Sequence, residues 1–282
     1  MLDDGRAAPP SRHGTDALRQ TIYAVILALG CLAGTADAAP TLCPEHFANG
    51  QAPDLVNSRL GFGARARCFD AFAVLHSAAT RTPLYAAEHL TAARIHAARQ
   101  TRRDSEFYAD PGLPPHERAG LSDYARSGFD RGHMAPSGDM PDPSAQQESF
   151  SLANIVPQDP ALNRGLWERI ESVVRDLAVQ RGELYVVTGP VFQGSRLATV
   201  GDVVVPTHVF KAVLDPRRRT AGAYLAPNTI DAGWRRISMA QLASLTGIDV
   251  FPGLTRRARA SAMRLPSPDN PSSVARFGRW RF

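Results

Sequence analysis

The stretch that decides the fold runs from Asp130 to Glu171 and contains three blocks of residues that carry chemistry. The blocks are Asp130-Arg131-Gly132-His133-Met134-Ala135-Pro136, Asn154-Ile155-Val156-Pro157-Gln158 and Asn163-x-x-x-Trp167-x-x-x-Glu171. Between the last two blocks, Asp159-Pro160 is typical of a helix start, with Asp as the cap and Pro at the first helical position. We therefore expect a short strand over 150–156 and then a helix that ends before Gly182.

The residue types in these blocks point to phosphodiester chemistry. His133 is the kind of side chain that best takes a proton near neutral pH, and Arg131 offers paired hydrogen bonds to a phosphate. The oxygens of Asn163 and Glu171 suit a hard cation such as Mg²⁺. A base, a guanidinium and oxygen ligands together are suited to metal-assisted hydrolysis of a phosphodiester bond.

The spacing of Asn163 and Glu171 limits how they share an ion. On a regular α-helix, eight residues correspond to about 80° in azimuth and roughly 12 Å along the axis. Both side chains therefore cannot touch one small ion directly. The arrangement that we expect has Asn163 as the ligand and Glu171 acting through water.

The rest of the chain predicts one α+β domain over 39–265 with an antiparallel or mixed sheet. The expected strands are Phe69–His76, Leu84–Leu90, Leu184–Val191, Val203–Leu214 and Gly222–Ala226, with a short helix over Ser238–Leu245. The segment Thr91–Arg103 fits either a short helix or an extended basic segment. A tail rich in Pro and Arg is expected over 266–282.

Composition excludes several classes of protein. The 282 residues are 44% hydrophobic and 21% charged, which is unlike a disordered or collagenous chain. The net charge of +5 favours anionic partners, but only weakly. The sequence contains no Gly-rich phosphate loop, no H-E-x-x-H helix and no C-x-x-C pair, which disfavours kinases, zinc proteases and thiol oxidoreductases.

Residues 1–38 have the pattern of a secretory signal peptide. An apolar run, Ile22–Gly34, follows Arg12 and Arg19 and precedes Ala36-Asp37-Ala38. The run is too short to span a membrane, which needs roughly 20 residues. We expect a cleaved signal, a periplasmic or extracellular protein and no membrane association after cleavage; an uncleaved N-terminal anchor is the alternative.

Two cysteines remain after cleavage, Cys43 and Cys68. In an oxidising compartment we expect them to form a disulfide, with two buried free thiols as the alternative. The closed loop of about 25 residues would stabilise the fold by roughly 3 kcal/mol in the chain-entropy model.

The three blocks, in this order and spacing, resemble the DNA/RNA non-specific endonucleases of the ββα-metal class. The similarity continues through 188–191, 206–211 and 223–228, and it covers most of the chain from Cys43 to Gly253. The resemblance implies a ββα-metal fold in one domain, with the central sheet flanked by helices.

The resemblance also implies a role for each matching residue. His133 corresponds to the general base that activates water. Asn163 corresponds to the single direct protein ligand of Mg²⁺, with Mn²⁺ as the alternative ion, and Glu171 to the carboxylate that holds the metal's waters. Arg131 corresponds to the arginine of the motif and Asn154 to an asparagine that orders the site.

An upstream arginine of the family binds the scissile phosphate. Arg103, four residues before Phe107, fits this position best. Arg99 and Arg102 are close enough to remain alternatives.

The function that follows is an exported, Mg²⁺-dependent endonuclease that cleaves DNA and RNA without strong sequence preference and leaves 5′ phosphates. It would contact nucleic acid through the phosphate backbone. The alternatives are an exported nucleic-acid-binding protein without catalysis and a toxin nuclease with an immunity partner. A homodimer and an inhibitor or immunity protein both stay open.

Overall fold

The computed structural model describes residues 1–2 and 41–270. By its contacts the chain divides into the units Met1–Asp37 and Ala38–Phe282. The predicted signal peptide, apart from Met1 and Leu2, lies outside the described residues, as do residues 271–282 of the predicted tail.

A seven-stranded antiparallel sheet forms the centre of the fold, with the strand order β12-β11-β10-β7-β4-β3-β2. The strands are β2 (Ala64–Cys68), β3 (Phe72–Ser77), β4 (Thr82–Thr91), β7 (Glu183–Val191), β10 (His208–Asp215), β11 (Thr220–Pro227) and β12 (Arg235–Ile237). The three strands in the middle of the sheet, β10, β7 and β4, are buried along most of their length, because helices cover both faces.

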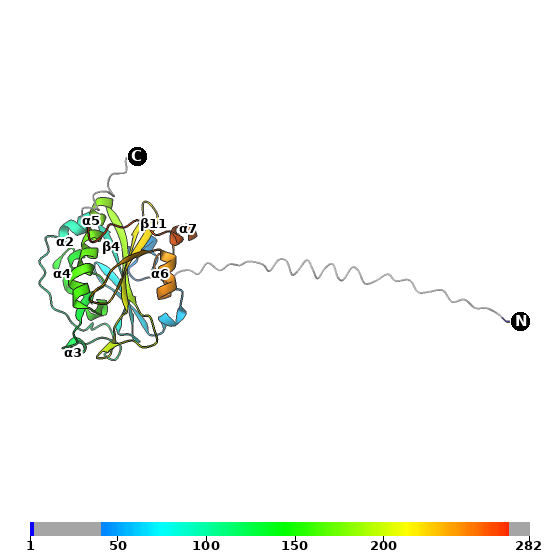
Figure 1. The fold of residues 1–282 in the computed structure, drawn as a ribbon, viewed down its shortest axis with the longest axis horizontal. Coiled ribbons are helices and arrows are strands. Elements are labelled where there is room, and N and C mark those ends of the chain that lie inside the picture. The colour runs from blue at the N-terminus through cyan, green and yellow to red at the C-terminus, as the bar shows by residue number, and fades with distance from the viewer. Residues whose placement is uncertain (3–40, 271–282) are drawn as a thin grey trace. The chain divides into compact units, whose positions relative to one another are not determined.

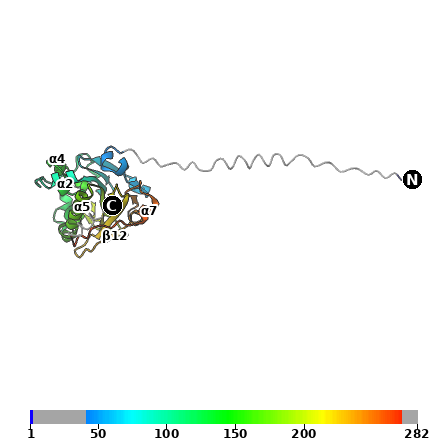
Figure 2. The ribbon, with the colours of Figure 1, turned by 90° about the horizontal axis from the view of Figure 1, so that it is seen from above.

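The helices form a layer on each side of the sheet (Figure 1, Figure 2). On one side lie α2 (Ala92–Ala98), α4 (Pro143–Ser149) and α5 (Glu168–Arg181), and on the other lie α6 (Met239–Thr246) and α7 (Arg256–Ala260). Alternate residues of β10 serve the two layers: Val209 and Val213 belong to the core with α5, whereas Phe210 belongs to the core with α6. The predicted α+β fold with a central sheet flanked by helices is confirmed.

Shorter elements complete the fold. They are β1 (Asp54–Leu55) paired with β13 (Ile248–Asp249), β5 (Asp130–His133) paired with β6 (Ile155–Gln158), β8 (Thr199–Val200) paired with β9 (Val203–Val204), α3 (Leu121–Tyr124), the 3₁₀ turns η1 (Pro44–His46), η2 (Ala48–Gly50), η3 (Ser58–Gly61), η4 (Ser137–Asp139) and η5 (Leu152–Asn154), and a π-helical segment η6 (Leu162–Trp167). The segment η6 continues directly into α5.

Several predicted elements differ from the structure at their ends. The strand expected over 150–156 begins only at Ile155, because residues 152–154 form η5. The strand expected over 203–214 is interrupted around Pro206, since proline cannot donate a backbone hydrogen bond. The segment from Thr91 forms α2 up to Ala98, and the side chain of Thr91 caps this helix at the Arg94 amide.

The beginning of the expected tail packs against the sheet. Leu265 is buried in the core beside α5, and the Tyr224 hydroxyl donates to the Pro266 carbonyl at 2.8 Å. These contacts join residues 265 and 266 to the folded part of the chain.

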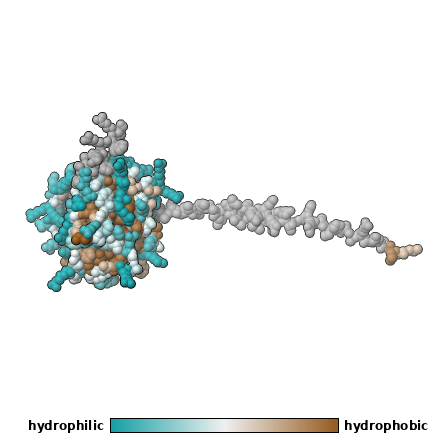
Figure 3. Space-filling model, in the orientation of Figure 1, coloured by the Kyte–Doolittle hydropathy of each residue, from teal (hydrophilic) through white to brown (hydrophobic). Residues whose placement is uncertain are grey.

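A disulfide joins Cys43 to Cys68, at the end of edge strand β2. Cys43 and Phe47 are buried in the core on the α6 side, so the bond ties the N-terminal arm to the edge of the sheet. The surface of the fold mixes hydrophilic and hydrophobic residues in the view of Figure 3. No helix within the described residues has the length and apolar character needed to cross a bilayer.

Candidate active site

The site is built on two short strands and the helix that follows them. In the β5–β6 pair, His133 lies opposite Ile155 and Gly132 opposite Val156. The helix then begins where the Asp159 carboxylate accepts the backbone amides of Ala161 and Leu162, at 2.8 and 3.3 Å. The strands and the helix therefore form a ββα unit, which places His133 beside the first turns of the helix.

Gly132 is required by the packing of the two strands. A Cβ atom at this position would lie 2.0 Å from Oε1 of Gln158. The same Cβ would lie 2.7 Å from the Cβ of Gln158, so any other residue would force the Gln158 side chain to shift.

A cavity of about 330 Å³ opens beside this unit, on the α5 side of the sheet. Five of the predicted site residues line it: Arg103, Arg131, His133, Asn163 and Glu171. Arg164, Glu168, Arg175 and Gln146 also line it, although the sequence did not indicate them.

His133 is held as a neutral imidazole. Its ring packs against those of Phe107 and Phe150, with centroids 5.3 and 4.9 Å away. Burial, together with the nearby charge of Arg103, lowers the pKa of His133 to about 3. Its Nε2 is buried and has no hydrogen-bond partner within the described residues. A neutral imidazole with a free nitrogen is the state that accepts a proton.

The side chain of Asn163 is oriented by Asp130. Asn163 Nδ2 donates to Asp130 Oδ2 at 2.9 Å, and Arg164 Nε donates to the same carboxylate at 2.8 Å. Burial opposes the charge on Asp130, but the hydrogen bonds from Arg164 and Asn163 lower its pKa overall. Because the amide nitrogen is engaged, Oδ1 is the Asn163 atom that remains to bind a cation.

Asp130 is bound to two side chains of the helix, Asn163 and Arg164. No local pattern indicated this contact, because it joins residues 33 and 34 positions apart.

The π-helical segment changes the relation between Asn163 and Glu171. Both residues line the cavity, whereas a regular α-helix would place them about 80° apart. If η6 takes up one extra residue, the effective spacing is seven residues and the angle falls to about 20°. The axial separation still prevents direct contact of both side chains with one small ion.

Two arginines at the cavity stack on aromatic rings. Arg131 Cζ lies 4.6 Å from the centroid of Phe107, and Arg103 Cζ lies 5.4 Å from that of Phe150. Both contacts have the geometry of a cation–π interaction. Of the alternatives to Arg103, Arg99 pairs with Asp176 at 2.6 Å, and neither Arg99 nor Arg102 lines the cavity.

Asn154 supports the site without reaching it. Its side chain accepts from the Ala135 amide at 2.9 Å and donates to the carbonyls of Ala135 and Ser149 at 2.8 and 2.9 Å. It is fully buried and does not line the cavity. Asn154 therefore orders the loop after His133 and makes no contact with the reacting groups.

The residues present fit a hard divalent cation. Asn163 offers a neutral oxygen, and burial raises the pKa of Glu171 to about 7 although Lys211 and Arg175 oppose this shift. Within the described part of the chain, no group of three or more His, Cys, Asp or Glu side chains could hold an ion. A cation here would be held mainly by water and substrate oxygens, as Mg²⁺ tolerates.

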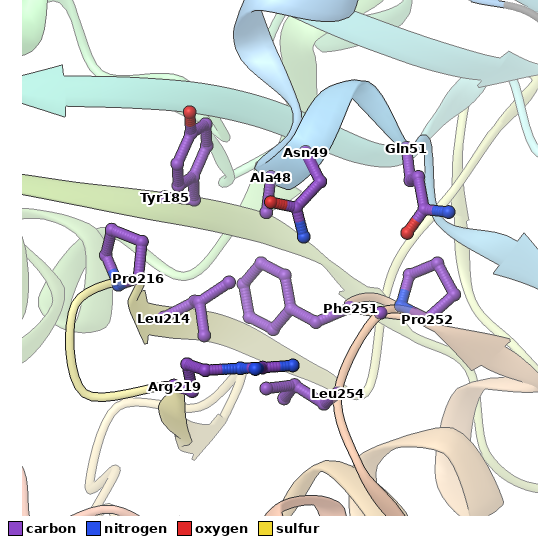
Figure 4. A pocket seen from close by; sticks show the side chains of 11 residues that line it. Ala48, Asn49, Gln51, Tyr185, Leu214, Pro216, Arg219, Phe251, Pro252 and Leu254 are labelled. Atoms are coloured by element: carbon purple, nitrogen blue, oxygen red, sulfur yellow. The ribbon is translucent and has the colours of Figure 1, made fainter.

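A second cavity, of about 340 Å³, lies on the α6 side of the sheet. Figure 4 shows side chains from the N-terminal arm, the sheet and the 251–254 loop gathered around it, Phe251 and Arg219 among them. Its lining contains no carboxylate and no imidazole. It therefore offers neither a proton acceptor nor an anionic ligand for a cation.

The relatives that comparison with known proteins finds are named as nucleases. "Nuclease EXOG, mitochondrial" of Homo sapiens is 34% identical over 235 residues, which cover 74% of this chain and 63% of that protein. "Nuclease C1" of Cunninghamella echinulata is 35% identical over 175 residues, 56% of this chain and 69% of that protein. The chain thus spans less than two thirds of the length of the EXOG relative.

The expected periplasmic or extracellular location is wrong on this comparison. Relatives from Homo sapiens, Schizosaccharomyces pombe and Saccharomyces cerevisiae are all named as mitochondrial nucleases, which conflicts with export. An apolar run after arginines is a targeting segment that a receptor recognises. Its composition alone does not identify the compartment. The Cys43–Cys68 bond is present in the structure, but the reason given for it, export, does not hold.

A solved structure shares the fold. The "Crystal structure of the EndoG/EndoGI complex: Mechanism of EndoG inhibition" aligns with a TM-score of 0.64 and 25% identity, covering 73% of this chain and 95% of that one. The family model for DNA/RNA non-specific endonucleases matches residues 54–257, which include the ββα unit and the cavity. The chain belongs to the DNA/RNA non-specific endonuclease family.

Proposed function

We propose that this protein is an endonuclease that hydrolyses phosphodiester bonds of DNA and RNA with Mg²⁺ and without strong sequence preference. The observation that carries the proposal is the convergence of His133, two arginines, Asn163 and Glu171 on one cavity. The family is metal-dependent, and the neutral and carboxylate oxygens that line the cavity suit a hard divalent cation, Mg²⁺ or, as the alternative, Mn²⁺.

His133 acts as the general base. Its neutral imidazole takes a proton from the attacking water. The negative charge of a bound phosphate stabilises the imidazolium and so raises the pKa of His133 from its low value in the free protein. Phe107 and Phe150 keep the ring in place during this transfer.

Arg103 and Arg131 bind the phosphate oxygens. Their stacked guanidinium groups are planar donors that match a phosphate, and little side-chain freedom is lost on binding. Asn163 and Glu171 would hold the ion, Asn163 directly and Glu171 through water. A bound divalent ion supplies charge neutralisation at the phosphate and at the departing 3′ oxygen, consistent with a 5′-phosphate product.

Tolerance of both DNA and RNA follows from the donors at the cavity. Arginines that contact phosphates position the backbone and carry no sequence information. A site that reads phosphate has no need of the 2′-hydroxyl, which is the group that distinguishes RNA from DNA.

A protein inhibitor is the partner that we propose besides nucleic acid, because the solved relative is described as a complex that explains EndoG inhibition. A non-catalytic binding role is less well supported, since the base, the arginines and the oxygen ligands all line the same cavity.

The test is nicking of supercoiled plasmid and cleavage of single-stranded RNA by purified protein, with Mg²⁺ and with chelator. We expect cleavage of both substrates in Mg²⁺, 5′-phosphate ends, and no cleavage with chelator. Tight binding of plasmid without cleavage in Mg²⁺ or Mn²⁺ would contradict the proposal and support the non-catalytic alternative.

A further inference from the structure

The cavity on the α6 side of the sheet has no part in the mechanism above, yet its lining is that of a ligand site. Among the residues that line it, Phe251 and Leu254 are buried, whereas the polar residues Asn49, Gln51 and Arg219 are exposed. Its volume of about 340 Å³ is sufficient for a small organic molecule. Apolar surface with a few polar groups around it is typical of small-molecule sites.

Arg219 brings a positive charge to this cavity. It belongs to the turn between β10 and β11, which also contains Arg217 and Arg218. Arg217 pairs with Glu183 at 3.5 Å. Arg218 pairs with Asp215 at 3.0 Å. In the described part of the chain, no ion pair or hydrogen bond engages the guanidinium of Arg219. Because the lining contains no carboxylate, this guanidinium is available to an anionic ligand.

The backbone conformation of two lining residues also points to a binding role. Asn49 and Arg219 lie in the left-handed region, with φ of 54° and 53°. Asparagine tolerates this region, whereas it is unfavourable for an arginine. Residues held in such conformations cluster at sites that bind ligands. The turn therefore keeps Arg219 at the cavity at a cost to the backbone.

Asn49 and Gln51 place two carboxamides close together at the cavity. A Cβ atom on Gly253 would lie 2.9 Å from Gln51 Oε1 and 3.3 Å from Asn49 Nδ2, so both groups approach the same point. In the view of Figure 4 they lie on one side of the Phe251 ring, and Arg219 lies on the other side. A carboxamide offers both a donor and an acceptor, so the two groups suit the edge of a nucleobase, adenine above all.

The surroundings of the cavity are held in place by contacts that do not use these polar groups. Arg259 donates to the carbonyls of Pro252 and Leu254, at 3.2 and 3.0 Å, and so supports the loop on one side. The Cys43–Cys68 disulfide ties the N-terminal arm on the other side to the sheet. A site that is formed before its ligand arrives loses little conformational freedom on binding.

We propose that this cavity binds a nucleoside 5′-monophosphate, with adenine as the preferred base. Arg219 holds the phosphate, and the Phe251 ring packs against the base. The carboxamides of Asn49 and Gln51 bind the edge of the base. Binding here takes no part in the proposed cleavage, because the two cavities lie on opposite faces of the sheet. One link rests on the proposed function: its products would end in the same chemical group, a sugar with a 5′ phosphate.

Calorimetric titration of the full chain with AMP, in chelator so that no metal ion contributes, tests the proposal. AMP should bind at least about 10-fold more tightly than adenosine or inorganic phosphate, because both the charge and the base are recognised. Arg219→Gln should weaken AMP binding about 10–100-fold, and Gln51→Ala about 2–10-fold. Arg217→Gln is the matched control in the same turn and should bind AMP as wild type does, because its charge is engaged by Glu183.

Arg131→Gln, in the cavity on the α5 side, shows which cavity holds the nucleotide and should leave AMP binding unchanged. A loss of binding in Arg131→Gln but not in Arg219→Gln would overturn the inference. Equal losses in Arg219→Gln and Arg217→Gln would overturn it too, as would adenosine or phosphate that binds as tightly as AMP, or no binding of AMP to wild type. Wild-type protein that binds AMP in this way but does not cleave plasmid would contradict the proposed function alone.

Discussion

The two faces of the central sheet carry cavities of similar size and very different chemistry. The cavity on the α5 side measures about 330 Å³ and the one on the α6 side about 340 Å³. The first contains an imidazole, two acidic side chains and several guanidinium groups, whereas the second contains one guanidinium, two amides and apolar or aromatic groups. The volume of a cavity therefore does not identify the active site. The type and placement of its polar groups do.

The same strands produce both faces, because alternate residues of a strand point in opposite directions. On β10, Phe210 and Ala212 serve the α6 side, while Lys211 between them serves the α5 side. One change of residue type within a strand thus places a charge on one face without disturbing the apolar core of the other.

The largest expected effect is a loss of cleavage rate from a substitution in one cavity but not in the other. His133→Ala should reduce the rate of plasmid cleavage about 10²–10⁴-fold, because the general base is lost. Arg219→Ala, in the cavity on the α6 side, is the matched control and should leave the rate unchanged. Single-turnover nicking assays measure both. A His133→Ala rate within a few-fold of wild type, or an equal loss in Arg219→Ala, would reject the assignment.

A smaller loss of activity should follow from releasing Asn163. Asp130→Ala removes the carboxylate that accepts from Asn163 Nδ2, so the amide loses the partner that orients it. Loss of a residue that orients a ligand typically costs about 10–100-fold. Asn163→Ala should cost more and raise the Mg²⁺ midpoint further. Titration of Mg²⁺ against nicking rate compares them, and a wild-type midpoint in Asn163→Ala would show that this helix does not hold the ion.

A large part of this site is predicted by local signals in the sequence. The Asp159-Pro160 start of the helix and the two strands expected over 69–76 and 84–90 depend on neighbouring residues, and the structure shows the helix start and the paired strands β3 and β4. The ordered blocks also contain four residues that line one cavity, Arg131, His133, Asn163 and Glu171. Such features are recoverable because capping, strand alternation and motif spacing act over a few residues.

The missed features depend on distant parts of the chain. Phe150 was expected in a strand, and its place against His133 comes from the packing of η5 before β6. The π-helical segment has no sequence signal of its own that we recognise, yet it lies between Asp159 and Glu171 and includes Asn163, so it alters the angle between Asn163 and Glu171. Glu88 and Lys211 lie on either side of β7, an arrangement that depends on the pairing of three strands. The cellular location depends on a targeting segment and is not a property of the fold.

The charge on the α5 face should also appear in the pH dependence of stability. Burial raises the pKa of Glu171 to about 7, so the metal-free folded protein binds more protons than the unfolded chain between about pH 4.5 and 7. Glu171 therefore stabilises the folded protein at low pH. This contribution, roughly 1–3 kcal/mol of the free energy of unfolding, is lost as the pH rises.

Glu171→Gln isolates this effect, because His133, whose pKa is lowered, acts with the opposite sign at lower pH in both proteins. We expect the melting temperature, measured in chelator, to change in a more destabilising direction from pH 5 to pH 8 in wild type than in Glu171→Gln. If the melting temperatures of the two proteins depend on pH in the same way, the pKa of Glu171 is not raised in the folded protein.

The smallest effect on catalysis is expected for the disulfide, which joins the arm of the α6 side to the edge of the sheet. Neither Cys43 nor Cys68 lines the cavity on the α5 side, so reduction should leave the nicking rate unchanged. The free energy of unfolding should fall by roughly 3 kcal/mol in the chain-entropy model, because the unfolded chain regains the freedom of a loop of about 25 residues. Denaturant titrations of the oxidised protein, the reduced protein and the Cys43→Ser/Cys68→Ser variant measure this. A large loss of activity at full folding in the reduced protein would show that the two faces are coupled through the sheet edge, contrary to the separation of roles inferred from their chemistry.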